Sequence, residues 1–330
     1  MAREYLKLNR PPVIVASAAV GGKMEGEGPL GEKFDMLDPT GRFGKDTWEQ
    51  AEAEMQGRAL GLALHKGKMR QDDLDMLLAG DLMNQCTSSS YGTLSYGIPF
   101  LGIYGACSTS AEGLLLASLL LDGGHAERAG VIASSHFCSA ERQFRYPLDY
   151  GGQRPPTAQW TVTASAAFIL AREGSGPRIT AVQAGRIVDG GITDANNMGA
   201  AMAPAAYDSL KRYFDSSHTC PDDYEKIVTG DLGAEGKGIL IDLFSKDGVV
   251  LGEGYDDCGL IIYDKNRQDV HAGGSGCGCS ASVLSTYLLP QKPSKLLYMA
   301  TGALMSPMSV KQGMSIPGIA HIVQIECGKD

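Results

Sequence analysis

The chain has 330 residues, of which 43% are apolar and 20% charged, and its formal net charge at pH 7 is −9. It is long enough for two domain-sized units around a large apolar core, and its negative charge argues against binding to nucleic acid. The longest apolar runs, LLLASLLL and MLLAG, are far shorter than the roughly 20 residues of a membrane-spanning helix. The eight cysteines lack the regular spacing of a secreted disulfide scaffold, which predicts a reduced, intracellular compartment.

The first predicted element is a strand in MAREYLKLNRPPVIVASAAV, where two prolines separate a short apolar piece from the basic start, unlike a signal peptide. A helix over 48–67 and a short apolar strand follow, and Asp81 comes directly after that strand in Gly-Asp-Leu. The Gly-rich turn in YGACSTSAEGLLLAS then leads into a helix over 108–121. Strands over 127–135 and 162–173 follow this helix along the chain. Leucines surround this helix almost completely, which predicts that it is buried on every side.

The second half of the chain repeats this order at a constant offset of 150 residues. Residues 71–85, QDDLDMLLAGDLMNQ, align with residues 221–235, PDDYEKIVTGDLGAE. Both segments enter a short apolar strand and finish in Gly-Asp-Leu. Asp231 is therefore predicted to be the equivalent of Asp81.

The remaining elements of the second half are a helix and two strands around a second Gly-rich turn, SGCGCSASVLSTYLL; they are expected at 204–214, 294–302 and 316–326. Strands that alternate with helices predict parallel sheets covered on both faces. Two such halves, 1–173 and 174–330, with buried helices between their sheets, predict an α/β fold: a five-layer α/β/α/β/α sandwich.

One segment, 136–160, fits neither helical nor strand periodicity. It is rich in proline, glycine and aromatic residues, and it carries Arg142, Arg145 and Arg154. An irregular segment of this length in a compact chain predicts a lid, a dimer loop or a binding loop.

The two Gly-rich turns contain the cysteines of chemical interest. Cys107 lies at the start of a predicted helix, where the dipole and free N–H groups favour a thiolate. Cys277 and Cys279 form a Cys-Gly-Cys pair, but no second paired-Cys or Cys/His motif completes a four-ligand zinc site. The sequence therefore predicts no metal site.

The duplicated layout, with a Gly-Ala-Cys turn at a buried helix, resembles the thiolase fold, which thiolases and ketoacyl synthases share. Within that superfamily, motifs in the same order from about residue 78 to residue 321 resemble the stage V sporulation protein AD family of endospore-forming bacteria. These motifs are LAGDLMNQ, YGACSTSAEG, SSHFCSAERQFRYPLDYGGQRPPTA, GITDANNMGAAMAPAA, TGDLGAEG, DDCGLIIY, AGGSGCGCSA, ATGALMSP and SIPGIAH. The segment GPLGEKFD extends the likeness toward the N-terminus.

The resemblance implies a protein that binds dipicolinic acid (pyridine-2,6-dicarboxylate) and supports its uptake into the developing spore. It also implies partners, the stage V sporulation A membrane channel proteins, and peripheral attachment at the forespore or spore inner membrane. Because thiolase-fold proteins usually pair their sheets across a two-fold axis, it further implies a homodimer. Residues 83–100 are expected to form part of that interface.

The resemblance also predicts that the catalytic chemistry is lost. Acyl transfer on this fold requires a group that moves the proton and donors that stabilise an oxyanion. Where related synthases place a histidine, this chain has Asp231, and the turn of the second half reads Gly276-Cys277-Gly278. The position of a second catalytic cysteine in thiolases reads Ser315-Ile316-Pro317-Gly318. Cys107 is therefore predicted to be a vestigial nucleophile in a pseudoenzyme that uses no cofactor; the alternative is a condensing enzyme that acylates Cys107 from acyl-CoA or acyl-carrier protein.

The ligand-binding site is expected at the ancestral acyl site, where backbone N–H groups at a helix start suit a flat dianion. The predicted binding residues are Cys107, Ser108, Thr109, His136, Arg142, Arg145, Asp231 and Cys277. Either arginine would supply a guanidinium, with a surface or dimer-interface role as the alternative. A satisfied structural histidine is the alternative for His136 and for His271. If calcium accompanies the ligand, Asp231 would add an oxygen ligand. A scaffold that only docks on the channel proteins is a third possible function.

Overall fold

The computed structural model describes residues 4–144 and 154–328. The strands of its main sheet are, in chain order, β1 (Leu6–Lys7), β2 (Val13–Gly21), β3 (Met36–Leu37), β4 (Met76–Gly80), β5 (Phe100–Gly102), β6 (Arg128–Ser135), β8 (Ala164–Ala171), β9 (Arg178–Gln183), β10 (Lys226–Thr229), β11 (Tyr255–Asp257), β13 (Leu296–Ala303) and β14 (Gly318–Glu326). A separate parallel pair joins β7 (Trp160–Thr161) to β12 (Gly274–Ser275).

The helices are α1 (Lys23–Gly26), α2 (Trp48–Lys66), α3 (Thr87–Thr93), α4 (Thr109–Asp122), α5 (Phe137–Phe144), α6 (Met198–Ser217), α7 (Gly233–Lys246), α8 (Cys258–Ile261), α9 (Cys277–Val283) and α10 (Pro307–Lys311). Single 3-10 or π turns lie at Gly31–Lys33, Gln71–Asp73, Asn84–Cys86, Leu94–Tyr96, Pro221–Asp223, Leu284–Leu288 and Leu289–Gln291.

The main sheet follows the order β11-β10-β13-β14-β9-β2-β8-β6-β4-β5, with β1 paired to β9 and β3 to β2. The ten strands of this order form two five-stranded halves, and strands of the two halves pair at Val13 and Arg178; β1 and β3 lie off this path. In each half the edge strand and the two strands next to it run parallel, and the inner strands are antiparallel. The shared order and directions reproduce the internal duplication that the sequence predicts.

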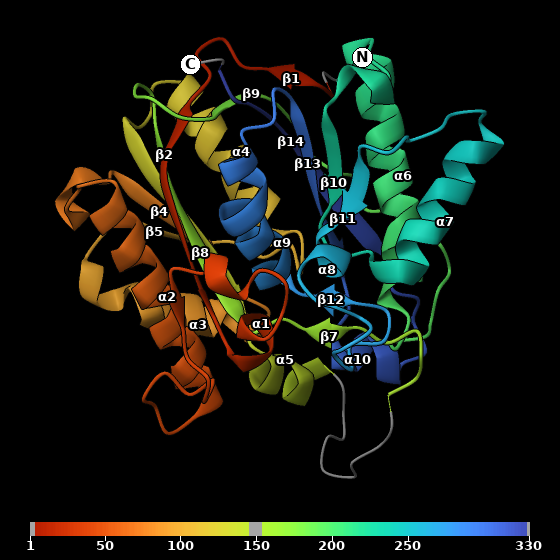
Figure 1. The fold of residues 1–330 in the computed structure, drawn as a ribbon, viewed down its shortest axis with the longest axis horizontal. Coiled ribbons are helices and arrows are strands. Elements are labelled where there is room, and N and C mark those ends of the chain that lie inside the picture. Colours follow the sequence, from red (N-terminus) through yellow and green to blue (C-terminus); the bar gives the residue numbers. More distant parts are fainter. Residues whose placement is uncertain (1–3, 145–153, 329–330) are drawn as a thin grey trace.

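Helices separate and cover the two sheet halves (Figure 1). Helices α4 and α9 lie between the halves: α4 packs on β6, β13 and β14, and α9 packs on β6 and β8. Helices α2 and α3 cover the outer face of the first half, and α6 and α7 cover that of the second. The predicted five-layer α/β/α/β/α sandwich is confirmed.

The central helix α4 is apolar because it packs on both sheet halves. Leu114 and Leu121 are fully buried in the core that it shares with β6 and β13. The prediction that this helix is buried on every side is wrong for Leu116, Leu119 and Leu120, which are partly exposed. The helix is thus a middle layer whose one flank reaches the surface.

The prediction of parallel sheets is wrong for the inner strands β14, β9, β2 and β8, which pair antiparallel. Two predicted elements also differ from the structure. Helix α6 begins six residues before the predicted start at Pro204 because Asn197 caps it, its side chain accepting a hydrogen bond from the backbone N–H of Ala200 at 3.2 Å. The prediction of an irregular segment over 136–160 is wrong for Phe137–Phe144, which form α5. Tertiary contacts hold this short helix, since the Phe137 ring stacks on Trp160 with 3.8 Å between ring centroids.

A buried carboxyl group fastens α1 to the rest of the fold. Glu25 Oε1 accepts hydrogen bonds from the backbone N–H of Thr163, at 3.0 Å, and from the hydroxyl of Tyr263. The side chain is fully buried, and burial raises the pKa of Glu25 to about 6. The neutral form of this carboxyl is therefore the one that the fold favours.

We expect Glu25 to make the free energy of unfolding depend on pH. Its pKa rises from 4.5 to about 6 on folding, so the folded state binds more protons between these values. The resulting stabilisation is fully present below pH 4.5 and is lost as the pH rises through about 6; it amounts to about 2 kcal/mol. Urea titrations should show the wild type losing about this much, relative to Glu25→Gln, between pH 4.5 and pH 7.5. Glu27→Gln changes an exposed glutamate and is the control, which should keep the pH dependence of the wild type. The same pH dependence of the unfolding free energy in wild type and in Glu25→Gln would contradict this role.

Candidate functional site

Cys107 lies in a tight turn directly before α4. Ala106, the preceding residue, has a positive φ of 50°, a left-handed conformation that places the cysteine at a sharp bend. The hydroxyl of Ser108 donates to the carbonyl of Gly105 at 2.6 Å, and that of Thr109 donates to the carbonyl of Ala106 at 2.7 Å. The hydroxyl hydrogens of the predicted binding residues Ser108 and Thr109 are therefore used within the turn.

Two glycines allow the neighbouring segments to approach this turn closely. A side chain at Gly302 of β13 would clash with the carbonyl of Gly105. Gly276, before α9, has a φ of 105°, and a side chain there would clash with Ser135. The two Gly-rich turns of the repeat are thereby packed against the ends of β13 and β6.

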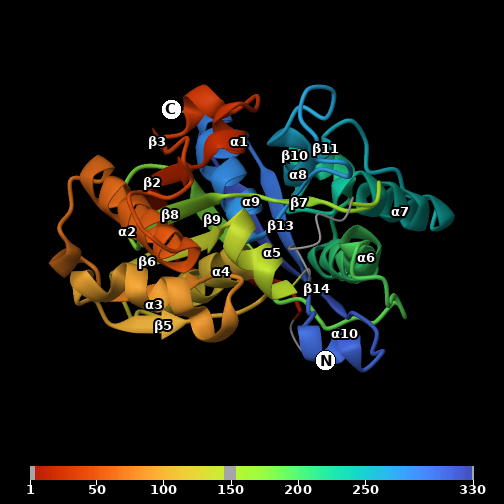
Figure 2. The same cartoon turned by 90° about the horizontal axis from the view of Figure 1, so that it is seen from below.

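The turn lines a small cavity whose walls include residues of α5 and β7. Figure 1 shows α5 and β7 at the same end of the molecule as α10, and Figure 2 shows the molecule from this end. The cavity is lined by Leu82, Tyr104, Ala106, Cys107, Ala140, Glu141, Thr161, Met198, Ser275, Ala303 and Met305. Its volume of about 30 Å³ corresponds to roughly one water molecule. A larger ligand would therefore extend beyond this volume, toward the exposed side of the cavity at Tyr104, or displace its walls.

Asp231 is the polar centre of this site. Its Oδ2 accepts from Ser275 Oγ at 3.0 Å and from the backbone N–H of Gly276 at 2.9 Å, and its Oδ1 accepts from Thr301 Oγ1 at 2.8 Å. Ser275 Oγ in turn lies 3.9 Å from Cys107 Sγ. The Asp231 carboxyl group thus connects the second Gly-rich turn to β13, next to Cys107. Burial raises the pKa of Asp231.

The surroundings of Cys107 disfavour a thiolate. Burial raises the pKa of Cys107 well above its ordinary value, and the charge of Asp231 raises it further. No histidine lies among the described residues that line the cavity. The cysteine therefore has the position of a nucleophile at a helix start, but its described neighbour is the carboxyl group of Asp231 and not a histidine.

Two other predicted binding residues, His136 and Cys277, are not among the residues that line the cavity. His136 Nε2 lies 2.8 Å from the carbonyl of Gly41, and its ring packs on Trp48, with 5.3 Å between ring centroids. Cys277 is fully buried behind the second turn, where its thiol donates to the carbonyl of Ser134 at 2.8 Å. Arg142 lies on α5, next to Glu141 of the lining, whereas Arg145 lies outside the described residues.

His271 makes contacts of a structural kind. Its Nδ1 lies 2.8 Å from the carbonyl of Pro155, and its Nε2 pairs with Asp269 at 2.8 Å. These contacts match the alternative to a place in the pocket, a satisfied structural histidine.

Several lining residues were missed by sequence reasoning. Ser275 has a detectable signal, because it directly precedes the glycine that starts the second turn. Glu141 and Thr161 lie in or just after the segment predicted to be irregular, and the hydroxyl of Thr161 donates to Glu141 Oε1 at 2.9 Å. Met198, the first residue of α6, and Met305, just after β13, have no signal in the sequence.

Asp81, the equivalent of Asp231 in the first half, has a similar structural task. It accepts from the backbone N–H of Met83 at 2.8 Å, and from the backbone N–H and hydroxyl of Ser89 at 2.8 and 2.6 Å. Both acidic residues of the repeated Gly-Asp-Leu therefore bind segments that follow their strand.

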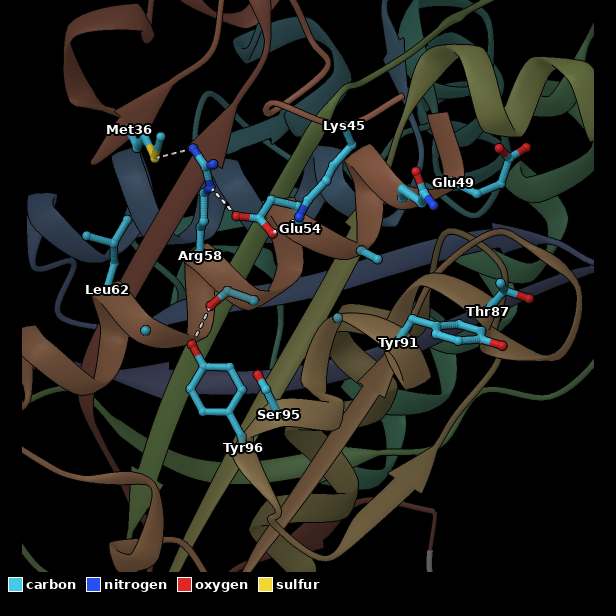
Figure 3. A pocket seen from close by; sticks show the side chains of 15 residues that line it. Met36, Lys45, Glu49, Glu54, Arg58, Leu62, Thr87, Tyr91, Ser95 and Tyr96 are labelled. Atoms are coloured by element: carbon cyan, nitrogen blue, oxygen red, sulfur yellow. Dashed lines mark hydrogen bonds and ion pairs between the residues drawn. The ribbon is translucent and has the colours of Figure 1, made fainter. Parts of the chain in front are cut away.

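A larger hollow, a groove of about 1050 Å³ along α2 and α3, shares no described lining residue with the Cys107 cavity; Figure 3 shows the side chains that line this groove. Glu54 in this groove pairs with Arg58 at 2.8 Å and with Lys45 at 3.1 Å. These three charged side chains therefore interact with one another within the groove. The residues with nucleophile-type geometry are at Cys107.

Residues 4–144 and 154–328 contain no group of three or more His, Cys, Asp or Glu side chains that could hold a metal ion. Within the same residues, none of the helices has the length and apolar character needed to cross a membrane.

Comparison with solved structures shows the fold. The chain is similar to 3-oxoacyl-[acyl-carrier-protein] synthase III from Aquifex aeolicus, with 12% identity, a TM-score of 0.57 and coverage of 94% of this chain and 99% of that one. It is also similar to cerulenin-bound OleA from Xanthomonas campestris, with 13% identity, a TM-score of 0.61 and coverage of 96% of this chain and 97% of that one. Both resemblances concern the architecture alone.

Comparison of sequences shows the family. A family model described as stage V sporulation protein AD matches residues 2–326. Stage V sporulation protein AD of Bacillus subtilis strain 168 is 45% identical over 320 residues, which cover 96% of this chain and 94% of that protein. The chain therefore belongs to the stage V sporulation protein AD family, a family of sporulation proteins, and it has the thiolase-like fold of the condensing enzymes.

Proposed function

We propose that this protein binds dipicolinic acid at the Cys107 cavity and supports its uptake into the developing spore without catalysing a reaction. The observation that carries the proposal is that the described neighbours of Cys107 are Asp231 and Ser275, where an active nucleophile would have a histidine. Cys107 keeps the position of a nucleophile next to a cavity, but burial and the negative charge of Asp231 disfavour its thiolate form. Membership of the sporulation family supports the biological role.

The charges around the cavity define what the ligand needs. Glu141 lines the cavity and Asp231 lies behind it, so a free dianion would meet negative charge there. The ligand therefore requires compensating positive charge. Arg142 and Arg145, at and after the end of α5, would supply it, and a calcium ion bound to the ligand would act in the same sense.

The proposed partners are the stage V sporulation A membrane proteins, at the forespore or spore inner membrane. Family membership supports this placement. The protein would present dipicolinic acid to the channel and not itself transport it.

Calorimetric titration with dipicolinate, with and without calcium, tests the binding proposal. We expect heat of binding for the wild type and at least a tenfold loss of affinity for Ala303→Leu, whose longer side chain would fill a cavity of about one water molecule. Cys107→Ala and Arg145→Ala should also weaken binding. Arg172→Ala, which removes an arginine paired with Glu127 at the end of β8, is the matched control and should bind normally. Absence of heat for the wild type at high micromolar ligand would refute binding, and unchanged affinity in all three site variants would move the site elsewhere.

A condensing enzyme is the second candidate function. The left-handed turn before Cys107 and the likeness to synthases of this fold favour it. The two functions are separated by incubation with acetyl-CoA and measurement of the intact mass. We expect no added acetyl group, because the Cys107 thiol is held neutral. A gain of one acetyl group that is absent in Cys107→Ala would establish the enzyme instead.

We also propose a homodimer formed through the edge strand β5. All three residues of β5 are exposed, and the segment before it exposes Tyr91 (71%) and Leu94 (74%). Pairing of two β5 strands across a two-fold axis would satisfy the open edge and cover this apolar surface.

Light scattering of the purified protein tests the dimer. The wild type should have twice the mass of one chain, and Leu94→Glu should shift it toward the monomer, because it places a charge in an apolar interface. Val250→Glu is the control, since Val250 is equally exposed (77%) but follows α7, on the far side of the molecule from α3 (Figure 1). A wild-type monomer, or equal dissociation by both variants, would contradict the proposed interface.

A further inference from the structure

A second pocket lies beside the N-terminal strand β1. Figure 1 shows β1 and β9 at the opposite end of the molecule from α5 and β7. The pocket has a volume of about 280 Å³, just below the range of drug-sized ligand sites, and its lining includes three charged side chains, Lys7, Lys295 and Glu326. It shares no described lining residue with the Cys107 cavity. The pocket is therefore a site of its own.

The chain at β1 forms one wall of this pocket. Tyr5 and Lys7 both line it, since side chains two residues apart lie on the same side of an extended chain. The backbone N–H of Leu8 donates to the carbonyl of Thr180 at 3.0 Å, which extends the pairing of β1 with β9. The Tyr5 ring packs edge-on against the buried ring of Tyr213, with 5.2 Å between ring centroids. This wall is thus held by both its backbone and its side chains.

An irregularity between β9 and β14 positions the carboxylate of the pocket. The register shifts between Gln324 and Ile325, which leaves Thr180 without a partner residue in the ladder. Thr180 Oγ1 donates to Glu326 Oε1 at 3.1 Å, and Gln324 Nε2 donates to the same oxygen at 2.8 Å. Glu326 Oε2 has no hydrogen-bond partner among the described residues. One carboxylate oxygen is therefore fixed, and the other is available to a ligand.

The charged side chains of the pocket are not paired with one another. Lys295 Nζ lies 4.4 Å from the centroid of the Tyr224 ring, a contact that attracts a cation but does not neutralise it. In the part of the chain that the structure describes, Lys7, Lys295 and Glu326 form no ion pair, although all three line the same pocket. The space between them is therefore open to a charged ligand.

Two acids close to Lys295 are bound elsewhere. Asp223 accepts a hydrogen bond from the backbone N–H of Cys220 at 2.8 Å. Glu225 Oε2 accepts from the backbone N–H and the hydroxyl of Ser294, at 2.7 and 2.8 Å. Neither carboxylate lines the pocket. The positive charge of Lys295 is thus left for a molecule within the pocket.

The charges of the pocket define a complementary ligand. Two ammonium groups and one carboxylate each require an opposite charge, and a molecule with two carboxylates and one ammonium group matches them one to one. Among small biological molecules, this is the charge pattern of an acidic α-amino acid. A peptide does not match, because its peptide bonds use the α-ammonium or the α-carboxylate group of such a residue.

We propose that the pocket between β1, β9 and β14 binds a free acidic α-amino acid, aspartate or glutamate. Lys7 and Lys295 hold its two carboxylates, and Glu326 Oε2 accepts from its ammonium group. No covalent step takes place. The inference is independent of the proposed binding of dipicolinic acid, which concerns the other end of the molecule.

Titration of the wild-type protein, followed by ligand-observed NMR, tests the proposal. A ligand of about ten non-hydrogen atoms should have a dissociation constant on the order of a millimolar. We expect L-aspartate or L-glutamate to bind in this range. Succinate and glutarate, which lack the ammonium group, and L-alanine, which lacks the second carboxylate, should bind roughly fivefold more weakly. Absence of binding by both acidic amino acids at about 20 mM, or equal binding of succinate and aspartate, would overturn the proposal.

Lysine variants test the location of the site. Lys7→Gln and Lys295→Gln should each weaken binding of the acidic amino acid about fivefold, because each removes the partner of one carboxylate. Lys33→Gln is the matched control, since Lys33 Nζ also lies over a tyrosine ring, that of Tyr287 at 4.7 Å, and does not line the pocket. Its affinity should equal that of the wild type. Wild-type affinity in both pocket variants, or an equal loss in Lys33→Gln, would contradict the proposed site.

Glu326→Gln tests the selectivity of the pocket. This variant removes the partner of the ammonium group and also the charge that repels a simple dicarboxylate. Aspartate should therefore bind more weakly than to the wild type, and succinate more tightly. Bound amino acid should also slow hydrogen exchange of the Leu8 N–H, which bonds to Thr180 across the strand pair. Unchanged selectivity in Glu326→Gln, or unchanged exchange at Leu8 in the wild type, would overturn the assignment.

Discussion

The bond network of the Asp231 carboxylate is the interaction on which the site depends. It holds a glycine-rich turn, a serine hydroxyl and a threonine of β13 together within the core. These three groups come from separate parts of the second half, and the carboxylate brings them to the back of Cys107. A histidine at this place could exchange a proton with the cysteine, whereas a buried carboxylate fixes the turn and opposes the thiolate. The same residue thus explains both the rigid shape of the site and its poor nucleophile.

Duplication of the fold accounts for the position of the acidic groups. Asp81 and Asp231 follow equivalent strands and bind segments after them, so each half contributes one buried carboxyl at the end of the corresponding strand. The first half adds a second buried acid, Glu52, that is linked to its aspartate by serine and glutamine side chains. The second half adds Asp257 instead, which accepts from backbone N–H groups at the start of α7. The two halves have therefore kept a common scaffold and acquired different electrostatic surroundings.

Much of the architecture could be predicted because it depends on patterns that repeat. The offset of 150 residues aligned Asp81 with Asp231, and the leucine-rich helix indicated a middle layer between two sheets. The cavity could not be predicted to the same degree. Its walls use Met198 and Met305, which are distant in sequence and whose contact depends on side-chain packing. Helix α5 was missed because its stability comes from the stacking of Phe137 on Trp160 and not from its own length.

The pairing of β1 with β9 has a consequence for the order in which the molecule assembles during synthesis. Leu6 and Lys7 lie opposite Val182 and Ala181, so the first strand of the chain cannot find its neighbour until more than half of the protein has been made. The strands β2, β4, β6 and β8 can pair among themselves before that point. We therefore expect β1 to pair with β9 late in folding, after the strands of the first half have paired with one another.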